Sequence, residues 1–348
     1  MEIKEQSGLR AVLKDVELPD MYLVRQHFPR DGIADVPAYL HDKLNREDLK
    51  ARIKPGMRVV LTGSSRQIAN MPVVLRELAG FVKSLGAQPY IIPAMGSHGG
   101  ATAQGQREIL ESYGITEEFC QCPIYSSMET VQVGTMACGD EVRMDKFAYE
   151  ADAIILVGRI KAHTAFRGKY ESGLIKMMAI GLGKREGADS LHRAGFGRMG
   201  ERLPQYAKVV YDHCNIIFGV GTIENESDQT CRIEVLPGEE IFEKEPELLL
   251  YAKSRLPRLL FPETDVLMVH EIGKNFSGSG MDPNVTGTFG TPYATGGIKK
   301  QRTVVLDISP ESHGSFVGLG NADTTTKRAF EKLDTNATYF NMITSTVL

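Results

Sequence analysis

The sequence predicts an α/β fold, with two α/β domains, mainly parallel sheets and the active site in the interdomain cleft. Three observations lead to this prediction. The chain has 348 residues, which is long for a single hydrophobic core. Several short apolar runs, rich in β-branched residues, pass into glycine-rich or polar ends. These runs alternate with helical patterns, an order typical of parallel strands that are covered on both faces.

Three strand-like runs organise the first half of the chain. They cover residues 57–63, 87–102 and 151–166, and each continues from an apolar core into a polar or glycine-rich end. The first two are followed by residues 71–86 and 102–114, where apolar positions recur about every 3.6 residues and predict helices.

The second half repeats this alternation. A helical pattern at 200–214 leads to a strand at 215–225, and a second at 245–256 leads to a strand at 264–275. Another strand is expected at 302–309 and another helix at 321–333. We therefore expect an N-terminal catalytic and cofactor-tethering domain over 1–200 and a C-terminal domain over 201–348 that closes the cleft.

The last stretch, "NATYFNMITSTVL" (336–348), is apolar and strand-like, with no polar terminator. Two alternatives follow. The tail is an edge strand, or the natural protein continues beyond Leu348.

Composition excludes several classes of function. A formal charge of −4 gives no reason to expect a nucleic-acid or membrane-surface partner. The N-terminal residues lack the apolar stretch of a secretory signal, and no run has the roughly 18 apolar residues of a membrane span. The five cysteines are an odd number without CxxC spacing, which favours reduced thiols and a cytoplasmic location.

Polar side chains gather where the predicted strands end. The carboxyl ends of parallel strands meet at one edge, where such folds bind ligands. The resulting cleft would hold two histidines and several cations, which suits an anionic organic substrate or a phosphorylated cofactor. The residues at these ends are Arg66, His98, Lys161 and His163 in the first half, and Glu224, Asn225, Glu271, Lys274 and Asn275 in the second.

Each of these residues also has a purely structural interpretation. Only loop position supports a functional role for His98, and Arg66 alone could be a solvated arginine, although a bidentate grip on a carboxylate would suit it. Lys274 and Asn275 are expected to contact the substrate. The glycine-rich loop at 278–290 either cradles a ligand through its backbone amides or is a long surface loop. No established phosphate-binding or nucleophile motif is present.

The stretch from Gly158 to His192 places Lys176 inside an apolar run, "LIKMMAI". Two interpretations are open. A lysine in an apolar pocket has a depressed pKa and is nucleophilic, as a covalent anchor requires. Alternatively, the segment is a basic amphipathic helix whose lysine extends to solvent.

Four short motifs together resemble the nickel-pincer-nucleotide-dependent lactate racemase family. The first is the strand-end arginine of "TGSSRQIAN", and the second is "MGSHGGAT". The third is "KAHTAF", and the fourth is "ESGLIKMMAIG" followed by "DSLH". In the fourth, Lys176 follows Ser172-Gly173, and His192 comes sixteen positions after the lysine. The resemblance covers residues 57–195 and, more loosely, the rest of the chain.

The resemblance implies a nickel-pincer nucleotide, a pyridinium mononucleotide that is bound covalently to a lysine through a thioamide. By this resemblance Lys176 is the tether and His192 the nickel ligand. His98 and His163 are the acid/base pair on opposite faces of the substrate, and Arg66 holds the substrate carboxylate. Ser172 and Gly173 are expected to lie at the cofactor.

The activity implied by the resemblance is racemisation or epimerisation of a 2-hydroxy acid through reversible, proton-coupled hydride transfer. Removal of hydride gives a planar keto acid, which can accept hydride on its other face. Two histidines of near-neutral pKa would let either enantiomer enter. A square-planar nickel site with sulfur donors needs only one imidazole, so no local metal-binding motif is expected.

The sequence also departs from the family pattern. Gly63 stands three positions before the arginine, where the family's racemases have an acidic residue, and the extra residues "FRGKYES" make Lys169 a rival tether. The extra cations Lys161, Arg167 and Lys169 suit either a more anionic substrate than lactate or the cofactor phosphate.

Two alternative functions remain open from the sequence: a nicotinamide-dependent 2-hydroxy-acid oxidoreductase, and a non-catalytic nucleotide- or metal-binding protein. The expected partners are a small 2-hydroxy acid and the proteins that synthesise the cofactor. The oligomeric state is undetermined, with a homo-oligomer as one alternative.

Overall fold

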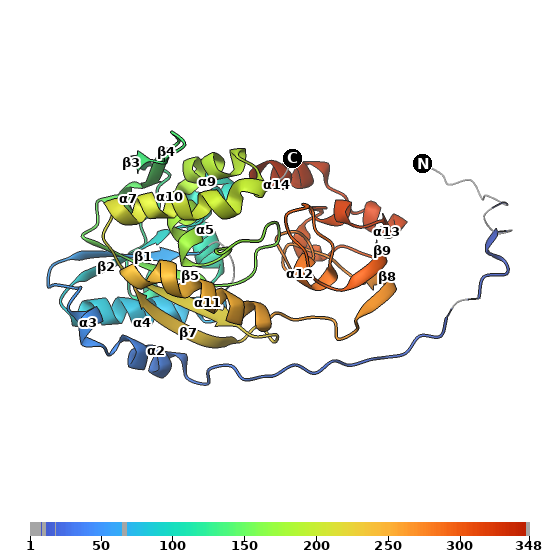
Figure 1. Ribbon diagram of the computed structural model, residues 1–348, viewed down its shortest axis with the longest axis horizontal. Helices are drawn as coiled ribbons and strands as arrows, with labels where there is room; N and C mark the ends of the chain where they lie inside the picture. The colour runs from blue at the N-terminus through green and yellow to red at the C-terminus, as the bar shows by residue number, and fades with distance from the viewer. Residues whose placement is uncertain (1–7, 9–11, 18, 65–67, 346–348) are drawn as a thin grey trace.

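The computed structural model of the chain describes residue 8 and residues 12–17, 19–64 and 68–345. Its larger β-sheet has the strand order β2-β1-β5-β6-β7 (Figure 1). The first four strands of this order are parallel, and β7 pairs antiparallel with β6. The strands are β1 (Arg58–Gly63), β2 (Gln88–Pro93), β5 (Ala153–Arg159), β6 (Ile216–Glu224) and β7 (Thr230–Pro237). The predicted α/β class with a mainly parallel sheet is therefore confirmed.

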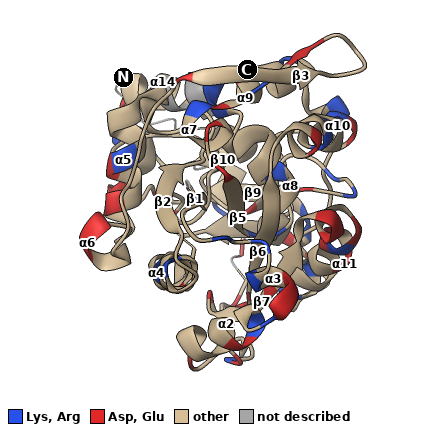
Figure 2. Cartoon of the chain, turned by 90° about the vertical axis from the view of Figure 1, so that its left-hand side faces the viewer, with Lys and Arg blue, Asp and Glu red and all other residues tan. Residues whose placement is uncertain are grey.

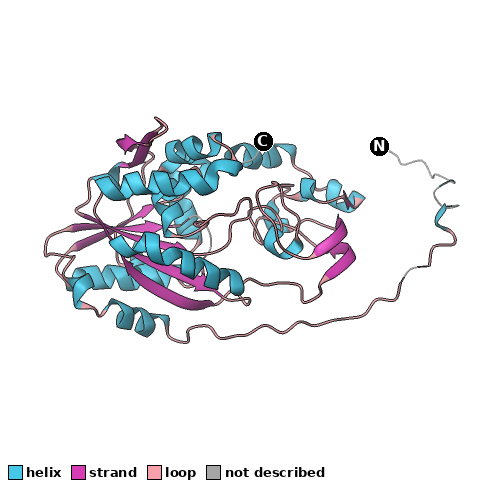
Figure 3. Cartoon of the chain, viewed as in Figure 1, coloured by secondary structure: helices cyan, strands magenta, loops and turns pink. Residues whose placement is uncertain are grey.

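Helices cover both faces of this sheet because successive side chains of a strand point to opposite sides. In β1, Val59 and Leu61 belong to one core and Val60 to the other. The first core is covered by α2 (Val36–Leu44) and α4 (Met71–Ser84), and the second by α10 (Met199–His213) and α11 (Ile241–Ser254) (Figure 3). All five β1 residues from Val59 to Gly63 are buried.

The order of connections creates a switch point at the centre of the sheet. The chain leaves β1 toward β2 on one side, whereas it leaves β5 toward β6 on the other. In open parallel sheets such a point leaves a crevice outside the carboxyl ends of the two strands, where ligands bind. The loops that follow β1 and β5 are thus the ones that the topology brings to this crevice.

The remaining elements of this unit are short helices and one separate hairpin. The hairpin of β3 (Thr130–Thr135) and β4 (Glu141–Asp145) is antiparallel and was not expected from the sequence. The helices are α3 (Glu47–Lys50), η1 (Gly99–Ala101), α5 (Ala103–Ser112), α6 (Glu117–Cys120), α7 (Lys146–Tyr149), α8 (Leu174–Lys176), the π-helix η2 (Met177–Gly181), α9 (Lys184–Arg193), η3 (Phe196–Arg198) and η4 (Gly238–Glu240).

A second, smaller unit is built on three parallel strands in the order β10-β9-β8. Its core contains only Ile272, Met281, Val305, Ile308 and Ala329 among the described residues. The elements are β8 (Glu263–Val269), α12 (Pro283–Thr286), β9 (Lys299–Val305), η5 (Pro310–Ser312), η6 (Leu319–Asn321), β10 (Thr324–Thr325), α13 (Lys327–Phe330) and α14 (Thr335–Ser345).

The expected domain boundary near residue 200 falls inside the larger unit. Strands β6 and β7 lie in the five-stranded sheet, and α11 packs on its second core. We therefore propose a boundary after α11, near residues 255–262, where the chain leaves this sheet and approaches β8. The sequence favoured the earlier position because one βα unit resembles the next in its apolar pattern.

An edge strand is one of the two alternatives predicted for residues 336–348. This prediction is wrong over the described part of the segment, which forms helix α14. Asp334 caps this helix, because its carboxylate accepts a 2.8 Å hydrogen bond from the amide of Ala337. This cap lies just before the apolar tail and favours the start of a helix there.

Acidic and basic residues are interspersed over the helices in the view of Figure 2. All five cysteines are unpaired thiols. Within the described residues, no helix combines the length and the apolarity needed to cross a bilayer.

Candidate active site

The loops that carry both predicted acid/base histidines leave the same edge of the five-stranded sheet. His98 follows β2, and His163 follows β5, with β1 between these two strands. The loop after β1 carries Arg66, which lies outside the described residues. The segments that carry His98 and His163 thus leave the carboxyl edge of the sheet, beside the switch point.

The hydrogen bond of the His98 ring assigns its tautomer. Nδ1 lies 2.7 Å from the carbonyl oxygen of Met95. A carbonyl can only accept, so Nδ1 carries the hydrogen and donates it. Nε2 is then the basic nitrogen of the neutral ring, the form that a general base requires.

The His163 ring has the opposite hydrogen-bonding pattern. The backbone amide of Ala165 donates to His163 Nδ1 at 3.1 Å. Nδ1 therefore accepts, and the hydrogen of the neutral ring sits on Nε2. The two histidines thus present opposite tautomers, although both follow a parallel strand of the same sheet.

The pKa of His163 lies well below the ordinary histidine value, which corrects the expectation of a near-neutral pKa. Burial is the largest cause, and the positive charge of Lys176 is next, followed by Lys161, His192 and Arg167. This ring is held neutral by its surroundings. A bound anion among the same cations would favour the protonated form.

A buried carboxylate organises the His163 loop. Glu171 is fully buried and accepts a 2.7 Å hydrogen bond from the amide of His163. It pairs with Lys253 of α11 at 2.6 Å and lies 3.6 Å from Arg167. Its second oxygen also accepts from the amide of Gly168 at 3.3 Å. Sequence analysis did not single out Glu171.

Contacts between the two units converge on this same loop. The Arg167 guanidinium donates to the carbonyl of His163 at 2.6 Å and to Asn284 Oδ1 at 2.6 Å. It also donates to the carbonyl of Thr295 at 2.9 Å. Asn284 belongs to the glycine-rich segment 278–290, so part of that segment holds the His163 loop through Arg167.

Lys176 is half-buried at the end of α8, immediately before the π-helix η2. Its charge lowers the pKa of both His163 and His192, which places it close to both rings. The following residues, Met177 and Met178, are buried as the apolar run predicted. π-Helical turns are rare and often occur at functional sites. Lys176 is therefore within electrostatic range of both histidines and is half-buried rather than on an open surface.

The segment that begins α8 rests on a second buried carboxyl group. Glu245 of α11 is buried, and its Oε2 accepts a 3.0 Å hydrogen bond from the amide of Ile175. Burial raises the pKa of Glu245 to about 7. A Cβ on Gly173 would lie 2.6 Å from Glu245 Oε1, so this position has no room for a side chain. The predicted cofactor-binding glycine is thus packed directly against a carboxyl group.

His192 lies in the last turn of α9 and faces an aromatic cluster. Its ring centroid is 5.7 Å from that of Phe196, which is 6.1 Å from the His163 ring. Burial by surrounding atoms lowers the pKa of His192, with the charge of Lys176 second, although the residue is exposed by its accessible surface. An exposed imidazole beside this cluster is accessible to a bound group.

The other predicted site residues make contacts outside the cluster of Lys176, His163 and His192. Lys169 is exposed, with its ammonium 5.3 Å from the Tyr170 ring centre. Ser172 pairs with Lys161 through backbone hydrogen bonds of 3.0 and 3.2 Å. Lys274 and Asn275 follow β8, and Asn275 Oδ1 accepts a 2.8 Å hydrogen bond from Ser309, within the second unit.

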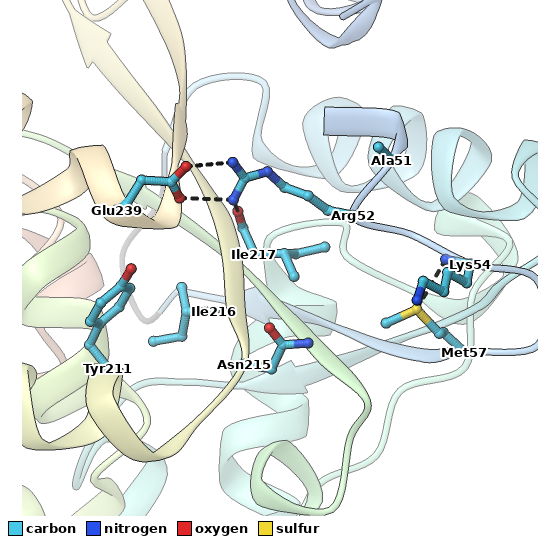
Figure 4. A pocket seen from close by; sticks show the side chains of 9 residues that line it. All are labelled: Ala51, Arg52, Lys54, Met57, Tyr211, Asn215, Ile216, Ile217 and Glu239. Carbon is cyan, nitrogen blue, oxygen red and sulfur yellow. Dashed lines mark hydrogen bonds and ion pairs between the residues drawn. The ribbon is translucent and has the colours of Figure 1, made fainter. Parts of the chain in front are cut away.

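A cavity of about 420 Å³ lies at the opposite edge of the larger sheet, at the start of β6 (Figure 4). Arg52 and Glu239 face each other there at 2.5 and 2.8 Å, so the arginine is already neutralised. This cavity is separate from the histidine loops because it adjoins the amino end of the strand. It brings together none of the predicted site residues.

The fold and these loops define a parallel α/β protein with a cationic, histidine-bearing site at the carboxyl edge of its sheet. The family model described as the lactate racemase N-terminal domain matches residues 12–203, which is more than half of the chain. The chain therefore belongs to the lactate racemase family.

Solved structures agree with this fold. The lactate racemase apoprotein of Thermoanaerobacterium thermosaccharolyticum is 14% identical, with a TM-score of 0.50, and the match covers 81% of this chain and 71% of that one. A crystal structure of a Thermotoga maritima protein is 15% identical, with a TM-score of 0.55 and coverage of 78% and 68%. No curated protein matches the chain. At such identities the structures establish the fold alone.

Proposed function

We propose that the protein is a racemase or epimerase of a 2-hydroxy acid that uses a nickel-pincer nucleotide. The observation that carries this proposal is the grouping of His163 and His192 around the Phe196 ring, with Lys176 within electrostatic range of both histidines. Family membership supports the reaction type, and the half-buried position of Lys176 supports a covalent anchor over a solvent-extended lysine.

The donor set fits the proposed cofactor. A pincer ligand supplies most of the nickel coordination, so a single accessible imidazole, as at His192, is sufficient. Lys176 would hold the group covalently, in preference to the exposed Lys169. Ser172 and Gly173 would lie beside it. When bound, the cofactor supplies a reversible hydride acceptor.

The chain's own residues would manage the substrate and its protons. Arg66 would bind the substrate carboxylate. Nε2 of His98 would take the hydroxyl proton, because Nδ1 already carries a hydrogen. Nε2–H of His163 would donate a hydrogen bond to the substrate oxygen from the other side.

For the second histidine to return a proton to the opposite face, His163 has to become charged. Its Nδ1 would then carry a hydrogen, so the Ala165 amide would have to turn away. The substrate carboxylate would favour this charged ring, since the cations around His163 otherwise disfavour it. Lys274 and Asn275 would contact the substrate only if the second unit closes over the site, in the interdomain cleft that we propose.

Optical activity tests the proposal. Loaded protein should convert one enantiomer of its 2-hydroxy acid into a mixture of both, without net formation of keto acid. His98→Gln and His163→Gln should each lower kcat by about 10²–10⁴-fold. His213→Gln is the control, because that ring bonds to the carbonyl of Val209 on α10. Net keto-acid formation would instead favour the nicotinamide-dependent oxidoreductase.

The partners proposed with this function are a small 2-hydroxy acid and the proteins that synthesise and load the cofactor. A cytoplasmic location and a homo-oligomer also stay predictions. Gel filtration coupled to light scattering would measure the oligomeric state.

A further inference from the structure

Lys184, the first residue of α9, is completely buried. Its φ is 53°, in the left-handed region that glycine adopts at lower cost. A lysine at such a position loses both its hydration and its preferred backbone conformation. Strained backbone of this kind persists where the surrounding structure requires that residue.

Three buried acceptors surround the Lys184 ammonium. Nζ lies 2.6 Å from the carbonyl oxygen of Pro93, 3.1 Å from Gln106 Oε1 and 3.0 Å from Asp145 Oδ2. The contacts with Pro93 and Gln106 are hydrogen bonds, whereas the contact with Asp145 is an ion pair in which Oδ2 has no hydrogen-bond geometry. These partners come from three separate elements, β2, α5 and β4.

Two of these contacts lead to the His98 loop. Pro93 is the last residue of β2, five positions before His98. The buried amide of Gln106 donates to the carbonyl of Gly96 at 2.8 Å and to that of His98 at 3.2 Å. Its oxygen is meanwhile held by Lys184, which fixes the orientation of the amide. The ammonium therefore controls the backbone on both sides of the turn that presents His98.

The same lysine begins the helix that carries His192. Helix α9 runs from Lys184 to Arg193, so His192 lies about two turns further along a rigid element. The turn of the His98 loop also packs against this region, since a Cβ on Gly96 would lie 3.1 Å from Ile180 and 3.5 Å from Ala188. The contacts of Lys184 thus join the two segments that bear His98 and His192.

We propose that Lys184 is a positioning residue that sets the placement of His98 relative to His192. This inference rests on the proposed function, in which His98 acts on the substrate and His192 on the metal. Lys184 touches neither group itself. Its ammonium acts through the Pro93 carbonyl, the Gln106 amide and the first turn of α9.

The test replaces the pair together, as Lys184→Met with Asp145→Asn, so that no uncompensated buried charge is left. The matched control is Lys208→Met with Asp212→Asn, an exposed lysine–aspartate pair on α10. Histidine side-chain NMR of the full-length apo protein is the first readout, with signals assigned from His98→Gln and His192→Gln. We expect the His98 and His192 signals to shift in the pair variant and to stay unchanged in the control.

The second readout is the loaded enzyme. The pair variant should lower kcat by about 10–100-fold, the usual effect of removing a group that orients a ligand, while KM stays within about threefold. A folded pair variant with unshifted His98 and His192 signals and the kcat of the control would overturn the inference and leave Lys184 a structural residue only.

If the pair variant does not fold, the NMR measurement is made on Gln106→Leu instead. It keeps the ion pair and removes the two hydrogen bonds to the His98 loop. His98 signals should shift while His192 signals stay, and unchanged His98 signals would contradict the inference. The NMR measurement uses the apo protein, so it tests the positioning role of Lys184 even if the wild-type protein racemises no acid. The absence of racemisation would reject only the proposed function.

Discussion

The loops that bear His98 and His163 are held by buried charges of opposite sign, whose partners differ in burial. Lys184 and its partner Asp145 are both shielded from water, with side-chain exposures of 0% and 1%. Glu171 is also fully buried, but its partner Lys253 is 30% exposed. The His98 loop is thus fixed inside the core, whereas the His163 loop is fixed at a boundary with solvent, next to the second unit. The difference indicates a rigid side and an adjustable side of one site.

Lys184→Met alone should have the largest effect on the free energy of unfolding. It leaves the Asp145 carboxylate buried without its cation, so the free energy of unfolding should fall by about 3–5 kcal/mol. Urea unfolding measures this, with Lys208→Met as the control on an exposed pair. Equal effects of the two substitutions would contradict the rigid anchor.

Glu245 is another buried ionisable group, and its Oε1 has no hydrogen-bond partner in the described structure. Burial raises its pKa from 4.5 to about 7, so the folded chain keeps a proton that the unfolded chain releases. The contribution of protonated Glu245 to the stability of the fold is complete below pH 4.5 and is lost as pH rises to 7. The free energy of unfolding changes by about 3 kcal/mol over this range.

Urea unfolding at several pH values tests this, with Glu245→Gln as the comparison. The difference in unfolding free energy between wild type and variant should change over pH 4.5–7 and be flat above it. A difference that does not vary with pH over this range would contradict the raised pKa.

Glu171→Gln should have a smaller effect than Lys184→Met. The amide keeps one acceptor for the His163 amide but loses the charge that faces Lys253 and Arg167. We expect the free energy of unfolding to fall by about 1–3 kcal/mol. A loss as large as that of Lys184→Met would show that both loops are anchored in the same way.

Salt should produce the smallest difference. Partly exposed pairs are screened by ions, and buried pairs are screened much less. The coupling energy between Lys253 and Glu171, from a double-mutant cycle, should therefore fall by a few tenths of a kcal/mol as salt rises, while that between Lys184 and Asp145 holds. A larger salt dependence for the Lys184–Asp145 pair than for the Lys253–Glu171 pair would be inconsistent with the exposures of these side chains.

Sequence patterns predicted the elements whose residues are buried on both faces. The strands near 57–63 and 215–225 follow this rule, since continuous apolar runs leave few alternative structures. The helix near 71–86 was predicted from its 3.6-residue apolar period instead. The edge strand β7 and the separate hairpin of β3 and β4 were missed, because their apolar pattern is weaker.

The site prediction lacked the residues whose contacts lie far away in the sequence. Lys176 and His192 lie within one stretch, so their spacing was visible in the sequence. Lys184 lies in the same stretch, but its acceptors Pro93 and Gln106 are 91 and 78 positions away. A buried lysine is recognisable only through such partners. The low pKa of His163 likewise depends on burial and on cations that the fold brings together.

The most direct test of Lys176 as the covalent anchor is the intact mass of the protein isolated from a nickel-replete native host, followed by peptide mapping. We expect an added mass of several hundred daltons on the peptide that contains Lys176, absent in Lys176→Ala and retained in Lys169→Ala. An adduct that maps to Lys169, or a protein that racemises its acid without any adduct, would contradict Lys176 as the anchor of the site.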